Sequence, residues 1–261
     1  MLEFLPTHIK IYLYILTFIF GALMGSALNC LAYRMARQQK WSSGRSVCPD
    51  CGHTLGLLDL IPIFSWVFLK GKCRYCGAKV SVRYLMTELL MGSCFVSLLW
   101  RFDLSLQTVS ALVLCGCLFC LSLVDLETQI IPNRFLIIPA LTQAIVLLMD
   151  EGIIGLLAGI LPGLILGGGV LIISLIMDKV LKKDTMGGGD IKLLAVLGLF
   201  FTVPECLLLL VLACIIGIVM ASVLMKVNSE TPFPFGPALS VAAWVTLLVG
   251  SPIIRWYLNL F

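Results

Sequence analysis

The sequence has little charge for its length: only 12% of its 261 residues are Asp, Glu, Lys or Arg, whereas 60% are hydrophobic. A water-soluble domain needs far more charge to cover its surface. The low charge therefore excludes an ordinary soluble protein, and it places most of the chain against lipid or other apolar helices. The net charge of +4 gives little support to nucleic-acid binding.

Histidine is also scarce. Only His8 and His53 are present, and neither lies near a serine or cysteine motif in an apolar segment. This scarcity argues against a Ser-His or Cys-His protease, because such a nucleophile needs a neighbouring imidazole as its base. The sequence also lacks a glycine-rich nucleotide-binding motif following a strand, so no cofactor site can be located from such a motif.

The chain is rich in long apolar runs. A helix needs about 20 apolar residues to cross the hydrocarbon core. Eight runs approach or exceed this length, the sixth being short and ending against Pro204. The runs lie at residues 11–33, 84–100, 106–124, 131–149, 153–177, 189–202, 205–225 and 237–257. They predict an all-α polytopic membrane protein with about eight transmembrane helices.

The first run is expected to remain in the protein as a helix. It is too long for the apolar core of a signal peptide, and no small-residue cleavage site follows it. Asn29 before Cys30 is a poor match to a lipoprotein site. Gly21 and Gly25 form a small-xxx-small pair, which lets a second helix approach closely.

Lys and Arg residues gather in connections that would share one side of the membrane. The segment between the first two runs carries nine of the 18 basic residues. Basic connections stay in the cytoplasm. If this segment is cytoplasmic and each run crosses the membrane once, the connections alternate between the two sides. Only Lys10, Arg101 and Arg255 then lie outside, and both termini lie outside.

Four of the 11 cysteines form two matched C-x2-C pairs with a spacer of 21 residues, and a glycine follows each pair. These residues are Cys48, Cys51, Cys73 and Cys76. The pattern predicts a tetrahedral thiolate site for structural zinc or another thiophilic metal. Disulfides are the structural alternative, which a reducing cytoplasm disfavours, and a redox pair is the other. The seven remaining cysteines lie in apolar runs, where a thiol acts as a small hydrophobe.

The surroundings of the cysteine pairs leave two further alternatives. His53 is either an additional ligand or a spare polar loop residue. The apolar segment 55–71 between the pairs is expected to stay cytoplasmic or to dip shallowly, packing on the metal site or lying along the membrane interface.

Two carboxylates are expected at the same depth of the membrane. Asp125 ends the third run and Asp190 opens the sixth, so both lie at cytoplasmic helix ends. Carboxylates at this depth are costly and need a reason. Taken singly, Asp190 could be a helix N-cap and Asp125 an ordinary residue leaving the membrane. As a pair sharing one proton, they could activate water and polarise a peptide carbonyl.

The residues around Asp190 support the paired interpretation. Gly187, Gly188 and Gly189 precede it, remove side-chain bulk and leave backbone donors open to an extended peptide. Lys192 follows two residues later. Its ammonium either biases protonation of the pair or extends to the lipid headgroups.

The chain resembles the type IV prepilin peptidases in several motifs and in the order of these motifs along the chain. These enzymes belong to the GxGD aspartic protease class and are both leader peptidases and N-methyltransferases. The similarity covers nearly the whole chain. It rests on "GSALNCLAYRMA" at 25–36, the two cysteine pairs with "DLIPIFSW" between them, "SVRYLMTELL" at 81–90, "DLETQIIPN" at 125–133, "GGGDIKLLA" at 187–195 and "PFGPAL" at 234–239.

The resemblance implies activities that the residues alone do not. Prepilins and pseudopilins with a short basic leader would be cut after a glycine at the cytoplasmic face of the bacterial cytoplasmic membrane. Asp125 and Asp190 would perform the cut. The new N-terminus would then be methylated from S-adenosylmethionine. Loss of the methylation step is not excluded by the sequence.

The two activities are assigned to different parts of the chain. Residues 1–105, with the metal-binding insertion at about 34–83, would hold the methyltransferase part, and residues 106–261 the peptidase bundle, whose core is expected at about 106–225. Glu88 is the candidate for holding the incoming ammonium. Its alternative role is to pair with Arg83 or Arg34.

Two other classes compete with a peptidase. A zinc-bearing membrane scaffold would leave both aspartates as helix caps. A transporter would use the two carboxylates to carry protons or cations. The fifth run has glycines at 163 and 167–169, but it lacks the carboxylate that such a transporter needs.

Overall fold

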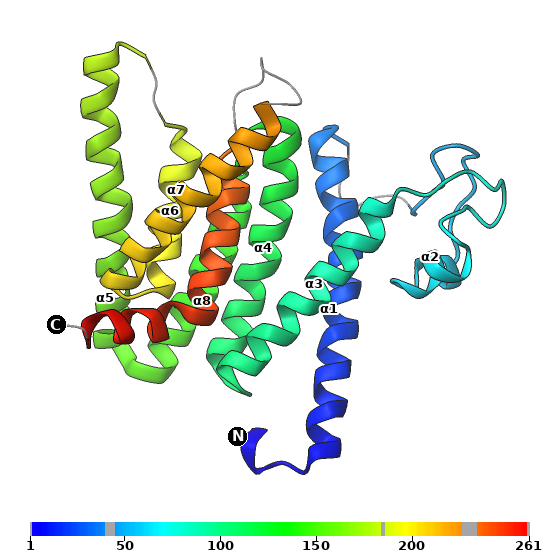
Figure 1. Cartoon of the computed structure of the whole chain (residues 1–261), viewed down its shortest axis with the longest axis horizontal. Coiled ribbons are helices and arrows are strands. Elements are labelled where there is room, and N and C mark those ends of the chain that lie inside the picture. Colours follow the sequence, from blue (N-terminus) through cyan, green and yellow to red (C-terminus); the bar gives the residue numbers. More distant parts are fainter. Residues whose placement is uncertain (1, 40–44, 184–185, 226–233, 260–261) are drawn as a thin grey trace. The chain divides into compact units, whose positions relative to one another are not determined.

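The computed structural model describes residues 2–39, 45–183, 186–225 and 234–259, and most of these are helical (Figure 1). The only β pairing within these ranges is two isolated bridges, Val47 with Thr54 and Lys72 with Lys79. The chain forms two compact units, Met1–Leu104 and Ser105–Phe261. The all-α membrane fold predicted from the apolar runs is therefore confirmed.

The first unit consists of two long helices and the cysteine-bearing insertion between them. A short 3-10 turn, η1 (Leu2–Phe4), precedes helix α1 (Thr7–Ala36), and helix α3 (Val82–Phe102) follows the insertion. The insertion contains the 3-10 turn η2 (Leu57–Leu60) and the five-residue helix α2 (Phe64–Phe68). Both α1 and α3 are long and apolar enough to cross a membrane.

Helices α1 and α3 meet where both lack side chains. A Cβ atom at Gly21 would lie 2.8 Å from the Met91 carbonyl oxygen and 2.9 Å from the Gly92 Cα. A Cβ atom at Gly25 would lie 2.9 Å from the Thr87 carbonyl oxygen. These distances are too short for any side chain, so the small-xxx-small pair seen in the sequence is the contact surface of α1.

Gly21→Ala is expected to destabilise the first unit by about 1–3 kcal/mol, because the new methyl group meets backbone atoms that cannot rotate away. Thermal unfolding of the purified chain in detergent would measure the change. Gly168→Ala is the matched control: it also lies in an apolar helix, but nothing lies within 4 Å of its added Cβ. Equal unfolding midpoints for the two variants would contradict the close contact.

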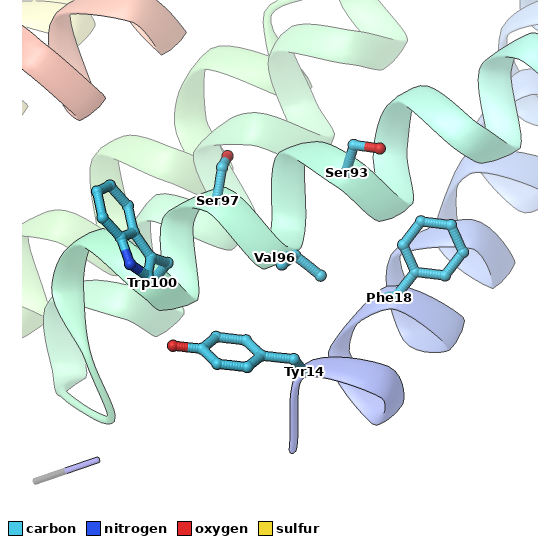
Figure 2. A pocket seen from close by; sticks show the side chains of 6 residues that line it. All are labelled: Tyr14, Phe18, Ser93, Val96, Ser97 and Trp100. Atoms are coloured by element: carbon cyan, nitrogen blue, oxygen red, sulfur yellow. The ribbon is translucent and has the colours of Figure 1, made fainter. Parts of the chain in front are cut away.

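An open hollow of about 490 Å³ lies on the α1–α3 pair (Figure 2). Tyr14 and Phe18 line it from α1, and Ser93, Val96, Ser97 and Trp100 line it from α3. Both serine hydroxyls donate to carbonyls of their own helix, Leu89 and Cys94. The hollow thus offers no carboxylate, thiol or basic group, and it is not a candidate for catalysis.

The second unit is a bundle of helices. It contains α4 (Leu106–Thr128), α5 (Arg134–Leu181), α6 (Gly188–Leu197), the 3-10 turn η3 (Gly198–Phe200), α7 (Val203–Met225) and α8 (Gly236–Leu258). Helix α4 packs against α5 and α8, and α5 packs against α6. Fully buried leucines on these helices form the core, among them Leu114, Leu121, Leu194 and Leu239.

Helix α5 combines the fourth and fifth predicted spans. Its 48 residues would extend about 72 Å as one straight helix, over twice the hydrocarbon thickness. Gly152 interrupts it with φ 69° and ψ −159°, a conformation that favours glycine. Figure 1 shows the chain turning back there, so α5 forms two antiparallel arms.

Helix α6 corresponds to the sixth predicted span, but it is only 10 residues long, about 15 Å. Helix α6 and η3 both pack closely on α5, where small residues meet. A Cβ at Gly198 would lie 2.3 Å from the Gly163 Cα, and one at Gly167 would lie 2.6 Å from the Ala195 Cβ. The glycines at 163 and 167 therefore allow close helix packing. They do not mark a broken helix of the kind found in transporters.

Candidate active site and metal centre

Asp125 lies in the last turn of α4 and is 5% exposed. Its Oδ2 accepts a hydrogen bond of 3.0 Å from the backbone N–H of Gly236, the first residue of α8. A Cβ at position 236 would lie 2.7 Å from this same oxygen. Glycine thus lets the positive end of α8 approach the carboxylate directly.

Asp190 is the third residue of α6, and its backbone N–H donates to the Gly187 carbonyl at 3.1 Å. Its Oδ1 is buried and has no hydrogen-bond partner among the described residues. The carboxylate is close enough to Asp125 for the two charges to repel each other. The structure therefore brings together the two aspartates selected from the sequence.

The loop after Asp125 contacts the first turn of α6, which carries Asp190. Helix α4 ends at Gln129, whose left-handed backbone (φ 56°) returns its N–H to the Asp125 carbonyl at 2.8 Å. Two residues later, Ile131 packs on Gly189, where an added Cβ would lie 3.0 Å from the Ile131 Cβ. The loop after Asp125 thus rests directly on the turn that carries Asp190.

The other glycines and Lys192 differ in their surroundings. A Cβ at Gly187 would lie 3.2 Å from Asp190 Oδ2, whereas nothing lies within 4 Å at Gly188. Lys192 Nζ is 3.5 Å from Asn133 Oδ1, a long hydrogen bond to the same loop. Exposed Gly188 and the open side of this turn leave room for a peptide backbone beside Asp190.

The four paired cysteines converge in the first unit. The sulfurs of Cys48, Cys51, Cys73 and Cys76 all lie within 4.8 Å of one another, and Cys48 Sγ is 3.9 Å from Cys76 Sγ. Tetrahedral thiolates at the usual zinc–sulfur distance of about 2.3 Å would stand about 3.8 Å apart. The donor set and its spacing therefore fit a structural zinc ion.

The two cysteine turns repeat one hydrogen-bond pattern. The N–H of Gly52 returns to the Cys48 carbonyl at 2.9 Å, and that of Gly77 returns to the Cys73 carbonyl at 3.0 Å. Both glycines have positive φ, 68° and 74°. The N–H groups of Cys76 and Tyr75 point at the Cys73 sulfur and lower its pKa to about 7.

Asp59 holds the second turn in place. Its Oδ1 accepts from Arg74 Nε at 2.7 Å, and its Oδ2 accepts from the Tyr75 hydroxyl and the Gly56 N–H, both at 3.0 Å. Burial raises the pKa of Asp59, but these hydrogen bonds outweigh it and keep that pKa below its usual value. The sequence marked Asp59 only as an interruption of an apolar segment.

His53 and Glu88 have contacts that the sequence did not predict. The His53 ring lies 3.6 Å, centroid to centroid, from the Tyr75 ring, and it is not part of the cysteine cluster. Glu88 is 7% exposed, and its Oε2 accepts the Ile63 N–H at 2.7 Å. Ile63 has φ 63°, a rare conformation for a β-branched residue.

Two family models match the chain on either side of the division between its units. The bacterial peptidase A24 N-terminal domain matches residues 19–102, and the type IV leader peptidase family matches residues 112–222. The cysteine cluster and Glu88 lie within the first match, and both aspartates lie within the second. No solved structure is significantly similar to the chain.

Curated relatives resemble the chain over nearly its whole length. The prepilin leader peptidase/N-methyltransferase of Stutzerimonas stutzeri is 32% identical over 268 residues, 92% of each chain. The protein of the same name from Aeromonas hydrophila is 32% identical over 275 residues, 94% of each chain. That from Neisseria gonorrhoeae is 30% identical and covers 92% of this chain and 93% of its own. This chain is therefore a multi-pass membrane enzyme that belongs to the type IV leader peptidase family.

Proposed function

We propose that this enzyme removes the basic leader of prepilins and pseudopilins, cutting after a glycine at the cytoplasmic face of the bacterial cytoplasmic membrane. The observation that carries the proposal is a pair of carboxylates at two helix ends in one bundle: Asp125, which is buried, and Asp190, which is half-buried with its Oδ1 enclosed. The names of the relatives supply the substrate class. The cytoplasmic side follows from the basic connections of the sequence.

The hydrogen bonds of the two aspartates differ, and this difference supports separate roles for them in the proposed reaction. Asp125 Oδ2 accepts the Gly236 N–H, which suits the carboxylate that takes a proton from the attacking water. Asp190 Oδ1, unpartnered among the described residues, is placed to give its proton to the scissile carbonyl. The tetrahedral intermediate then collapses: the leaving amine takes the proton that Asp125 received from water, and a hydroxyl of the intermediate returns a proton to Asp190 as the new carboxyl group forms. No covalent enzyme intermediate forms.

The substrate fits a site at this depth. A prepilin carries a basic leader followed by a long apolar helix, so its cut site would lie at the membrane interface. Its helix must unwind to expose the bond, and a glycine before the cut makes unwinding easier. The open turn at Gly187–Gly189 offers backbone donors to the unwound strand.

We assign methylation of the new N-terminus to residues 1–105, with S-adenosylmethionine as the methyl donor. The N-methyltransferase part of the relatives' names supports this assignment. The zinc ion would have a structural role, because four thiolates leave no open coordination position for a substrate.

Cleavage of a purified prepilin by the purified chain tests the proposal. Mass spectrometry should show a cut after the leader glycine, and a gain of one methyl group on the mature N-terminus when S-adenosylmethionine is added. An intact prepilin, or a cut elsewhere, would refute the assignment of substrate and bond.

Glu88→Gln should reduce methylation and leave cleavage unchanged. Glutamine keeps an oxygen for the Ile63 N–H but removes the charge that would hold the incoming ammonium. The measurement is the ratio of methylated to unmethylated product in one reaction. If methylation persists at the wild-type level, Glu88 acts only through its contact with Ile63.

Gly236→Ala should reduce cleavage about a hundredfold, because its methyl group would displace the Asp125 carboxylate by a large part of an ångström. The loss should appear in kcat and leave KM nearly unchanged, since the leader and the apolar helix still bind. Gly169→Ala is the matched control, with nothing within 4 Å of its Cβ. A wild-type kcat in Gly236→Ala would show that Gly236 does not position Asp125.

A further inference from the structure

The segment between the two cysteine pairs carries a patch of exposed apolar side chains. The members of this apolar patch are 54–87% exposed and come from η2 and α2: Leu57, Leu58, Phe64, Val67 and Phe68. The rings of Phe64 and Phe68 stack at 6.4 Å. Five large apolar side chains close together on a loop insertion mark an interaction surface.

The contact between Glu88 and Ile63 fixes the depth of this patch. Helix α3 has 21 residues, about 31 Å, just enough to cross the hydrocarbon core. Glu88 is six residues inside α3, about 9 Å along its axis from Val82. Because Glu88 Oε2 accepts the Ile63 N–H, the start of α2 lies beside the second turn of α3, inside the candidate membrane span Val82–Phe102.

The backbone of this segment is suited to an apolar environment, where each polar group needs an internal partner. Phe64 donates its N–H to the Pro62 carbonyl, Ser65 to that of Ile61 and Val67 to that of Ile63. The Ile63 N–H donates to Glu88, and Pro62 has no N–H. The start of α2 thus needs no water for these groups.

Exposed lysines lie directly beside the apolar patch. Lys70, Lys72 and Lys79 are exposed, and the first two follow α2 in the chain. Trp66 joins α2 to this basic stretch, because its Nε1 donates to the Val80 carbonyl at 3.2 Å and its ring covers Gly71. Apolar side chains flanked by lysines match the boundary between acyl chains and anionic headgroups.

We propose that η2 and α2 insert into the same lipid leaflet that one end of α3 occupies. The apolar patch contacts acyl chains, and Lys70, Lys72 and Lys79 contact anionic headgroups. The occupant is lipid because the contact with Glu88 holds the patch beside a helix long and apolar enough to cross the membrane, six residues inside that helix, and because exposed lysines follow the patch in the chain. The metal-binding insertion is thus anchored on the bilayer as well as tethered by α1 and α3, a role separate from catalysis.

A photoreactive residue at position 68 tests this inference in the full-length, zinc-loaded chain. Phe68 is replaced by p-benzoylphenylalanine, and the protein is reconstituted at low density in vesicles of phosphatidylcholine and phosphatidylglycerol. Illumination should give lipid adducts, counted by mass spectrometry, in a yield similar to that from the same residue at Trp100, an exposed position of α3. The yield should exceed that from Val47, half-exposed on the first cysteine turn, at least about tenfold.

The outcomes separate lipid from other occupants. Adducts to a second copy, or to another part of the same chain, in place of lipid would show that the patch is a protein contact and overturn the inference. Phosphatidylglycerol should be enriched among the adducts, and Lys70→Gln/Lys72→Gln/Lys79→Gln should remove the enrichment. Adducts without that enrichment would overturn the part of the inference that concerns the lysines.

Discussion

Replacing either Asp125 or Asp190 by Asn is expected to abolish cleavage of a prepilin while leaving the helix bundle folded. Asn keeps the size of the side chain, and at position 125 it can still accept the Gly236 N–H, but it cannot take or give the proton that the reaction moves. A general acid or base of this kind contributes about 10²–10⁴-fold, so each variant should be slower by at least that factor. Single-turnover cleavage followed by mass spectrometry measures it.

The double variant gives a sharper test. Because two carboxylates that share one step act as a unit, Asp125→Asn/Asp190→Asn should be no slower than the slower single variant. Glu127→Gln is the matched control, since this exposed carboxylate is two residues from Asp125 on the same helix end. Cleavage by either single variant at the wild-type rate would exclude the paired-carboxylate mechanism and favour a zinc-bearing scaffold.

The apolar runs were sufficient to predict the helices because the thickness of the bilayer sets their length. They were not sufficient to predict how the runs are joined. The runs at 131–149 and 153–177 correspond to the two arms of α5 (Arg134–Leu181), and the non-helical Gly152 lies between them. The sixth run falls short of a span, since α6 ends after 10 residues and leads into η3.

The two aspartates could be selected from the sequence because alternation of the spans puts them at one depth, where a carboxylate is costly. The residues that contact the two aspartates could not be selected in this way. Gly236 contacts Asp125 through its backbone N–H across 111 positions, so no periodic pattern links them. This contact brings α8 into the site, beyond the 106–225 segment in which the peptidase core was expected. The left-handed backbone of Ile63 likewise has no sequence signal, because such a residue is usually glycine or asparagine.

The cysteine cluster leads to the second large expected effect. Cys73→Ser/Cys76→Ser should prevent zinc binding and unfold the insertion, because a preformed four-thiolate site is absent from the unfolded chain and metal binding would supply the folding energy. For structural zinc sites this binding is worth about 10–16 kcal/mol, far more than the hydrogen bonds that Asp59 accepts can replace. Metal content measured by atomic emission, and proteolysis between residues 45 and 80, would report both losses.

Cys214→Ser is the control for the loss of a thiol, since Cys214 is exposed on α7 and outside the cluster. It should keep about one zinc per chain, the stoichiometry of a closed tetrahedral site. The same measurements decide between the metal site and the redox alternative. If the wild-type chain holds no zinc and Cys48, Cys51, Cys73 and Cys76 form disulfides on mild oxidation, the cluster is a pair of redox sites. If the zinc is present and resists mild oxidants, the four thiolates are occupied as ligands and the insertion depends on the metal for its fold.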